Sequence, residues 1–271
     1  MAIGLLCMIF ASTGLANTGK PLLLVSIPWQ KTDTLQQIYK PMMQYLEAEL
    51  NKPVQLYVSK DYKELSDRLV SGAADLGILG GNSYVDAKER YPDIQYVATC
   101  MQPTEYYQSL IIVRRDSGIK TLPDLAGKSF AFTDKKSTSG YLYPLLMLVS
   151  NGIVPETDFS ITYFLRKHDK VYDAVAKKVI DAGGVSKTAF DKAVERNSDV
   201  FDVLAASDPI PRNAVVAAPH LTTDKVQQLQ QLLSRASKSR FFRQSDSILK
   251  GFVVKDDSFY DIVREARKLR Q

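Results

Sequence analysis

The chain has 271 residues, which corresponds to about two domains at roughly 150 residues each, and 45% of its residues are hydrophobic and 24% charged. These proportions exclude a chain that is mainly disordered or of low complexity. The formal net charge of +5 is small for this length, and before the last dozen residues no basic run is interleaved with aromatics, so we expect no nucleic-acid partner.

The first sixteen residues have features of a signal peptide. They carry no charge, their apolar stretch is shorter than the about 20 residues of a membrane span, and Gly14 and Ala16 fit cleavage after Ala16. A buried N-terminal strand or helix is the alternative, because no Lys or Arg precedes the apolar stretch. Cleavage leaves one cysteine, Cys100, and therefore no internal disulfide and no metal site. We predict an exported, periplasmic or otherwise extracytoplasmic protein without a metal or other cofactor.

Apolar strand-like runs alternate with helical patterns along the whole chain, as in βαβ units around parallel sheets. First come expected strands at 22–27, 54–58, 76–79 and 94–99, and helices at 34–50, 62–71 and 83–90. A strand at 107–113 and a short helix at 121–125 lead to strands at 129–132, 160–164, 180–185 and 200–206, and helices at 141–150, 170–177 and 186–195. The chain continues with a strand at 214–218 and two helices at 223–242 and 258–269.

This order predicts an α/β protein of two lobes, each with a mixed, mostly parallel sheet flanked by helices. We place the first lobe at 17–110 and 209–271, and the second, inserted lobe at 111–208, so that the chain crosses between the lobes twice. Open α/β sheets bind ligands beyond the carboxyl ends of their strands, which predicts a ligand cleft between the lobes.

The polar loop at 133–140 is the sharpest functional signal. It follows a predicted strand and contains three consecutive hydroxyls, Ser137, Thr138 and Ser139, before Gly140 and a helix. A helix N-terminus offers unpaired N–H groups and about half a positive charge, hydroxyls add donors, and a glycine lets a ligand approach the backbone. The loop therefore indicates a site for a tetrahedral anion, without the spacing and lysine of a nucleotide P-loop. The alternative is a cluster of N-cap residues in an ordinary loop.

Further candidates stand where predicted strands end. His168 could bind an anion and add charge when protonated, or it could be an exposed loop histidine. Trp29, Tyr62 and Tyr107 could line the mouth of a cleft or serve in packing. Arg212 stands at the predicted return to the first lobe, where the alternative is an exposed surface arginine.

Enzyme motifs are poorly represented. The chain has two histidines and no HExxH, GxSxG or GxGxxG pattern, and helix capping explains Asp256 and Asp257 before Ser258. A phosphoesterase with a Ser139–His168 dyad is the enzyme alternative, but no third group that would orient the histidine is indicated. We do not expect an enzyme.

In order and spacing, a series of short segments resembles the phosphate, phosphite and phosphonate substrate-binding proteins of bacterial ABC transporters. The segments are IYKP at 38–41, YL at 45–46, DY at 61–62, ADLG at 74–77, YQSLIIV at 107–113, DSG at 116–118, LPDLAGK at 122–128, STSG at 137–140, AV at 174–175 and IDAG at 180–183. The resemblance implies a two-lobed, type II-like periplasmic binding protein that closes on its ligand. It also implies that the ligand is held by Ser137, Thr138, Ser139, Tyr62, Tyr107 and His168.

The chain departs from the aminoalkyl-phosphonate binders of this family. Those proteins place acids near the ligand's amine, whereas this chain has Thr188 and Asn213 at the aligned positions, so two negative charges are missing. Burying an ammonium without a counter-charge is costly, and we therefore expect no aminoethyl tail on the ligand. With Arg212 nearby, the expected ligand is phosphate, phosphite, methylphosphonate or another small oxyanion.

The sequence thus predicts an exported solute-binding protein that captures a small tetrahedral oxyanion by lobe closure and delivers it to the membrane permease of an ABC transporter. One alternative is a periplasmic sensing module that presents its bound state to a membrane sensor kinase. The third hypothesis is the phosphoesterase.

Overall fold

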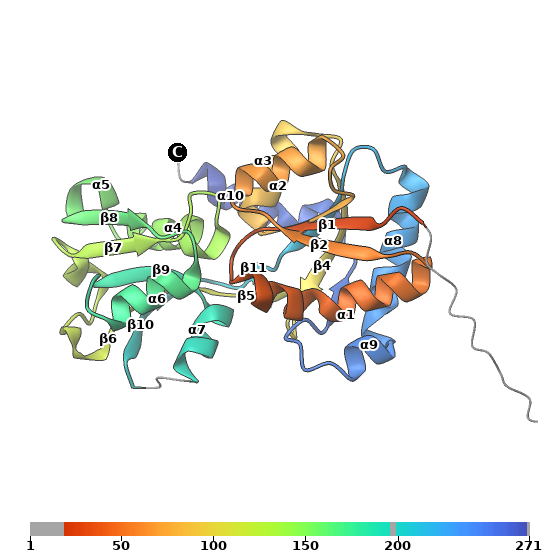
Figure 1. Cartoon of the computed structure of the whole chain (residues 1–271). Helices are drawn as coiled ribbons and strands as arrows, with labels where there is room; N and C mark the ends of the chain where they lie inside the picture. The colour runs from red at the N-terminus through yellow and green to blue at the C-terminus, as the bar shows by residue number, and fades with distance from the viewer. Residues whose placement is uncertain (1–18, 196–198, 270–271) are drawn as a thin grey trace, which may run out of the picture.

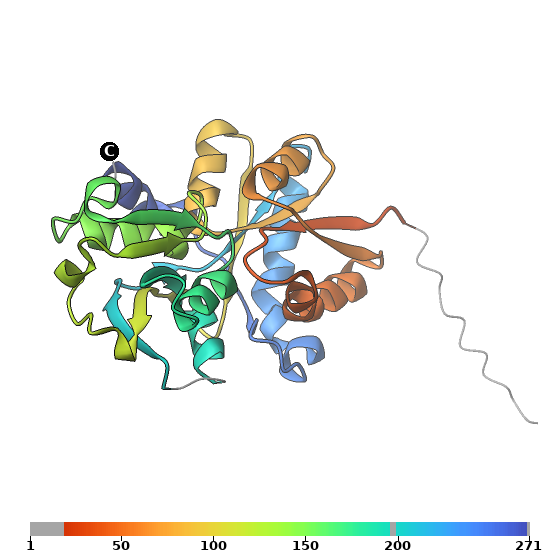
Figure 2. The ribbon, with the colours of Figure 1, turned by 60° about the vertical axis from the view of Figure 1, so that its left-hand side comes forward.

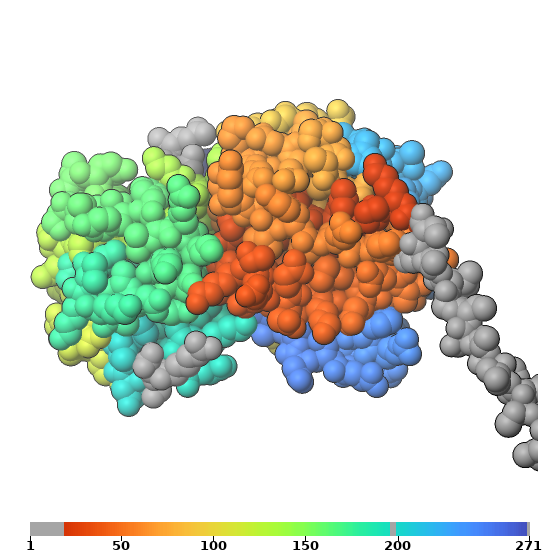
Figure 3. All heavy atoms as spheres, viewed as in Figure 1, coloured from red at the N-terminus to blue at the C-terminus, as the bar shows by residue number. Residues whose placement is uncertain are grey.

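The computed structural model describes residues 19–195 and 199–269, so the predicted signal peptide at 1–16 lies outside the described residues. The described chain forms two α/β lobes that lie side by side (Figure 1). Strands β5 (Tyr106–Tyr107) and β11 (Ile210–Pro211) pair antiparallel where the chain passes between the lobes. On the face seen in Figure 3, atoms of the two lobes abut along their boundary.

The first lobe is built on a six-stranded sheet in the order β13-β4-β12-β3-β1-β2. Its strands are β1 (Leu22–Ser26), β2 (Val54–Val58), β3 (Leu76–Leu79), β4 (Gln95–Met101), β12 (Ala214–Ala217) and β13 (Gly251–Val253). Its helices are α1 (Thr32–Leu50), α2 (Tyr62–Val70), α3 (Gly81–Arg90), α8 (Thr223–Arg235), α9 (Arg240–Arg243) and α10 (Asp261–Lys268), with 3₁₀ turns η4 (Ala236–Lys238) and η5 (Asp257–Tyr260). Helices α1 and α8 meet where the Tyr45 hydroxyl donates to the Leu232 carbonyl oxygen (2.9 Å).

The second lobe has a five-stranded sheet in the order β10-β6-β9-β7-β8. Its strands are β6 (Ser109–Arg114), β7 (Ser129–Phe132), β8 (Ile161–Phe164), β9 (Ala182–Ser186) and β10 (Phe201–Ala206). Its helices are α4 (Tyr143–Val149), α5 (Pro155–Asp158), α6 (His168–Ala176) and α7 (Lys187–Val194), with 3₁₀ turns η1 (Arg115–Ser117) and η2 (Leu122–Leu125) and a π-helical turn η3 (Thr138–Leu142). In the rotated view of Figure 2, helices again lie beside the strands in each lobe.

Each face of the second sheet has its own core because side chains alternate along a strand. In β6, Ile111 and Val113 pack with the α4 side, whereas Leu110 and Ile112 pack with Val171 of α6. A sheet buried on both faces explains why β6 is apolar at consecutive positions.

The predicted α/β fold with two lobes and mixed, mostly parallel sheets is confirmed: every antiparallel pair of the two described sheets involves β6, β12 or β13, and the other strands of each sheet run the same way. Within the two described sheets, β1 is parallel to β2 and β3, and β7 to β8 and β9, while the other five pairs are antiparallel. Strands β6 and β12 enter their sheets directly from β5 and β11, without a covering helix between them. A parallel pairing would need such a crossover, whereas an antiparallel pairing does not.

Several expected elements have different bounds. The strand predicted at 107–113 is divided between β5 and β6, and the helix predicted at 141–150 is preceded by the turn η3. The helix predicted at 223–242 ends at Arg235 and is followed by η4 and α9. This break lets η4 pack on β13, where a Cβ at Gly251 would lie 2.7 Å from the Cβ of Ser237. Strand β13 itself was missed, because it has three residues and begins with a glycine at φ +146°.

The loop with the three hydroxyls is anchored to both lobes. Leu142 and Tyr143, which follow it, are buried in the hydrophobic core of the first lobe although β7 before it belongs to the second sheet. Behind the loop, a Cβ at Gly140 would lie 1.9 Å from the Thr133 Oγ1 atom. Gly140 therefore allows close packing against the end of β7, and its approach by a ligand stays a prediction.

We predict that Gly140→Ala lowers the free energy of unfolding by about 1–3 kcal/mol, because the added methyl group must displace Thr133 from a tightly packed site. Gly19→Ala is the control, since its Cβ would lie 3.6 Å from the nearest atom, at ordinary contact distance. Urea unfolding of both variants tests this, and equal stability of the two would contradict the packing role of Gly140.

Candidate functional site

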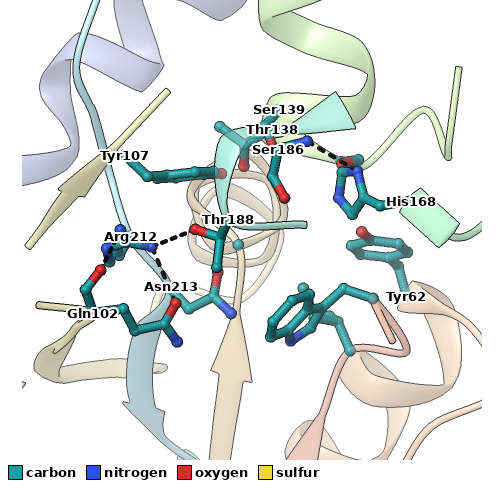
Figure 4. A pocket seen from close by; sticks show the side chains of 14 residues that line it. Tyr62, Gln102, Tyr107, Thr138, Ser139, His168, Ser186, Thr188, Arg212 and Asn213 are labelled. Atoms are coloured by element: carbon teal, nitrogen blue, oxygen red, sulfur yellow. Dashed lines mark hydrogen bonds between the residues drawn. The ribbon is translucent and has the colours of Figure 1, made fainter. Parts of the chain in front are cut away.

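A small pocket between the lobes is lined by all ten residues that the sequence proposed as ligand-binding side chains (Figure 4). They are Trp29, Tyr62, Tyr107, Ser137, Thr138, Ser139, His168, Thr188, Arg212 and Asn213. Ile27, Gly80, Gln102 and Ser186 complete the lining. The cavity measures about 40 Å³. This is about three times the roughly 10–15 Å³ that one water molecule needs, so the pocket suits a ligand of a few non-hydrogen atoms.

Five helices begin at this pocket. Tyr62 and His168 are the first residues of α2 and α6, Gly80 and Ser186 are the N-caps of α3 and α7, and Ser137 is the N-cap of η3, which continues into α4. Each helix N-terminus presents unpaired N–H groups and a partial positive charge. Because the lining contains no Asp or Glu, this combined potential favours an anion.

Two of the three hydroxyls of the loop are already engaged as acceptors. The Ser137 Oγ atom accepts a hydrogen bond from the Gly140 N–H (3.0 Å), and the Thr138 Oγ1 atom accepts one from the Asn82 N–H at the start of α3 (2.9 Å). A hydroxyl that accepts from a backbone N–H keeps its own proton to donate. These side chains can therefore donate hydrogen bonds to the oxygens of an anion.

His168 is buried, with 5% of its surface exposed, so the alternative of an exposed loop histidine is wrong. Its Nδ1 atom accepts a hydrogen bond from the Ser186 N–H (3.1 Å), which leaves the proton of the neutral ring on Nε2. Burial lowers the pKa of His168 to about 4. In the ligand-free protein at neutral pH the ring is thus a neutral donor, and the positive charge expected from it is absent.

The two pocket tyrosines keep their hydroxyl protons. Burial raises the pKa of Tyr62 above its ordinary value, and the negative charge of Asp134 raises it further. Burial likewise raises the pKa of Tyr107, against the opposing effects of the Ser139 hydroxyl and the Arg212 charge. The Arg212 guanidinium carbon lies 5.4 Å from the centre of the Tyr107 ring.

Arg212 is built into the wall of the pocket, so the alternative of an exposed surface arginine is wrong. Its Nε atom donates to the Thr104 carbonyl oxygen (2.8 Å) and Nη2 to that of Gln102 (2.6 Å). Nη1 donates to the Gln102 Oε1 and Thr188 Oγ1 atoms (3.0 Å each). The Tyr260 hydroxyl fixes the backbone by donating to the Arg212 carbonyl oxygen (2.7 Å).

Sequence reasoning missed four lining residues. Ser186 and Gly80 had a usable signal, since Ser186 ends β9 and Gly80 follows β3, and each stands directly before a helix. Ile27 and Gln102 carried none, because an apolar residue after a strand and a glutamine in a loop are common anywhere.

Among the described residues, no hydrogen bond joins His168 to Ser139. The His168 ring accepts a hydrogen bond from the Ser186 N–H, and no carboxylate among residues 19–195 and 199–269 hydrogen-bonds to it. In the same described ranges, no group of three or more His, Cys, Asp or Glu residues could hold a metal ion. No helix of the described chain has the length and apolar character to cross a membrane.

We predict that His168 makes the ligand-free protein less stable as the pH falls from about 6.5 to about 4. Between these values the unfolded chain protonates the imidazole and the folded protein does not, so the free energy of unfolding decreases with falling pH, by on the order of 3 kcal/mol in total. Below about pH 4 this loss is complete. Chemical unfolding at a series of pH values should show a shallower slope for His168→Asn, and an identical slope would contradict the buried neutral histidine.

Comparisons with known proteins agree with this arrangement. The family model for the ABC transporter, phosphonate, periplasmic substrate-binding protein matches residues 24–260. The chain is 27% identical over 266 residues to the phosphate-import protein PhnD of Mycolicibacterium smegmatis, covering 89% of this chain and 83% of that protein. It is 26% identical over 212 residues to the phosphonates-binding periplasmic protein of Escherichia coli, covering 74% and 62%.

A solved structure has the same fold. PhnD1 from Prochlorococcus marinus in complex with methylphosphonate superposes with a TM-score of 0.83 at 21% identity, covering 92% of this chain and 98% of that one. The family match spans most of the chain, including every residue that lines the pocket. The chain therefore belongs to the family of periplasmic substrate-binding proteins of phosphonate ABC transporters.

Proposed function

We propose that this protein captures a small tetrahedral oxyanion in the pocket between its lobes and delivers it to the permease of an ABC transporter, after export by the predicted signal peptide. The observation that carries the proposal is the chemistry of the pocket lining: hydroxyls, a neutral histidine, five helix N-termini and one arginine, with no carboxylate. Such a lining offers hydrogen-bond donors and positive potential, which a compact anion satisfies.

Lobe closure is the proposed mechanism. The first lobe comprises residues 17–110 and 209–271, and the second comprises residues 111–208. Tyr62 belongs to the first lobe and Ser139 and His168 to the second, so a ligand contacts all of them only when the lobes are together. A ligand that binds the closed state better shifts the population toward it.

Direct contacts between the lobes near the pocket support this mechanism. In addition to the bond between Asn82 and Thr138, the Lys136 Nζ atom lies 2.6 Å from the Asp86 Oδ1 atom. Both contacts join α3 of the first lobe to the loop that carries the hydroxyls. Closure therefore orders the loop that is proposed to hold the anion.

Phosphate, phosphite and methylphosphonate are the preferred candidates. The cavity volume of about 40 Å³ suits them, and the aligned acid positions are occupied by Thr188 and Asn213, so the lining offers no counter-charge for an ammonium. Aminoalkyl phosphonates should therefore bind more weakly than alkyl phosphonates of the same length.

A sensing role is the second candidate. The chain is 29% identical over 107 residues to the tetrathionate sensor histidine kinase TtrS of Salmonella typhimurium, covering 38% of this chain and 18% of that protein. Adjacent genes separate the two roles: genes for a permease and an ATPase favour transport, and a gene for a sensor kinase without them favours sensing.

We predict that Ser139→Ala weakens binding of the preferred oxyanion by about 1–3 kcal/mol, because it removes a hydrogen bond to a charged group. Ser150→Ala is the control, since Ser150 is exposed at the opposite end of α4. The single tryptophan, Trp29, lines the pocket and allows titrations with phosphate, phosphite, methylphosphonate and sulfate to be followed by fluorescence and checked by calorimetry. Binding of none of these anions would refute the proposed function, and equal affinities of the two variants would remove Ser139 from the site.

We also predict that the protein does not hydrolyse 4-nitrophenyl phosphate, since His168 is bound to Ser186 and is oriented by no carboxylate of the described chain. Release of nitrophenol followed by absorbance tests this. Turnover that disappears in His168→Ala would establish the phosphoesterase in place of the binding protein.

A further inference from the structure

One side of the pocket carries a positive charge that no acidic side chain balances. Figure 4 shows Arg212 with Gln102, Thr188 and Asn213 on this side, while His168 and Tyr62 lie on the other. We call the group of Arg212, Gln102, Thr188 and Asn213 the arginine wall. Within residues 19–195 and 199–269, the Arg212 guanidinium hydrogen-bonds to neutral oxygens and forms no ion pair.

The acidic side chain whose charge acts on Arg212 is already paired with a lysine. Asp191 is the carboxylate whose charge acts on Arg212, but both of its oxygens bind the Lys187 Nζ atom at 2.7 and 2.9 Å. Burial lowers the pKa of Arg212, which shows that its charge is incompletely solvated. A charge in this position is stabilised by an anion brought in from outside.

The neutral groups of the arginine wall also present donors. The Thr188 Oγ1 and Gln102 Oε1 atoms both accept from Arg212, so the Thr188 hydroxyl proton and the Gln102 amide N–H groups are left to donate. This side of the pocket thus offers hydrogen-bond donors, as does the loop that carries Ser137, Thr138 and Ser139, which we call the hydroxyl loop.

We propose that the ligand carries two acidic groups: a tetrahedral oxyanion held by the hydroxyl loop and His168, and a carboxylate that faces the arginine wall. The inference rests on the proposed oxyanion site and specifies its substrate class as small phosphonocarboxylates. The small volume of the cavity, about 40 Å³, favours the shortest linker between the two groups.

Calorimetry with two ligands of equal length tests the second group. Phosphonoacetate differs from ethylphosphonate by a carboxylate in place of a methyl group, and 2-aminoethylphosphonate puts an ammonium at that end. We expect phosphonoacetate to bind the wild-type protein at least tenfold more tightly than ethylphosphonate, with 2-aminoethylphosphonate weakest. Equal affinities for phosphonoacetate and ethylphosphonate would overturn the inference. They would mean that water hydrates the Arg212 charge from a neighbouring cavity of about 610 Å³, which Arg212 also lines.

Two substitutions assign the preference to the arginine wall. In Arg212→Gln the ratio of the two affinities should fall to about twofold or less, and Thr188→Val should lower it in the same direction. Lys250→Gln is the matched control, because Lys250 lines the neighbouring cavity and not the pocket, and it should keep the tenfold ratio. A ratio lost equally in Lys250→Gln would overturn the role of Arg212.

Two outcomes separate this inference from the proposed function. If ethylphosphonate and methylphosphonate bind and phosphonoacetate does not bind more tightly, this inference alone fails. If no oxyanion binds, the proposed function fails.

Discussion

The structure depends on one electrostatic constraint: a buried pocket that offers hydrogen-bond donors and a positive charge but contains no carboxylate of its own. In such a pocket each donor that loses water needs an acceptor, and Arg212 needs a counter-charge. The fold supplies this environment through backbone geometry, because two sheets direct five helix N-termini toward one place. An anion is the occupant that satisfies all of these groups at once.

In four hydrogen bonds around the pocket, the pocket side chain is the acceptor. Ser137, Thr138, Thr188 and His168 each accept from an N–H group of the protein, and each keeps a proton for a ligand. Two of these bonds also hold the architecture together, since Asn82 links the first lobe to the hydroxyl loop and Ser186 holds the histidine ring. The same set of hydrogen bonds therefore holds the donors in position and connects the two lobes.

The sequence allowed much of the fold and of the pocket lining to be predicted, for identifiable reasons. Alternating strand and helix patterns are local, and three consecutive hydroxyls before a helix have a direct electrostatic meaning. The state of His168 could not be predicted, because its burial and its bond to Ser186 depend on how α6 packs beside α7. The same holds for Gly140, whose neighbour Thr133 is in contact only after the loop folds back on β7. Whether β6 and β12 run parallel or antiparallel to their neighbours depends on how the chain passes between the lobes. No local sequence pattern indicates that passage.

The most direct test of the central claim is a crystal structure of the protein with methylphosphonate. The account predicts the phosphonate oxygens within hydrogen-bonding distance of the Ser137, Thr138 and Ser139 hydroxyls and of the His168 Nε2 atom, with both lobes in contact with the ligand. A saturated complex whose phosphonate lies elsewhere, or contacts one lobe only, would contradict it.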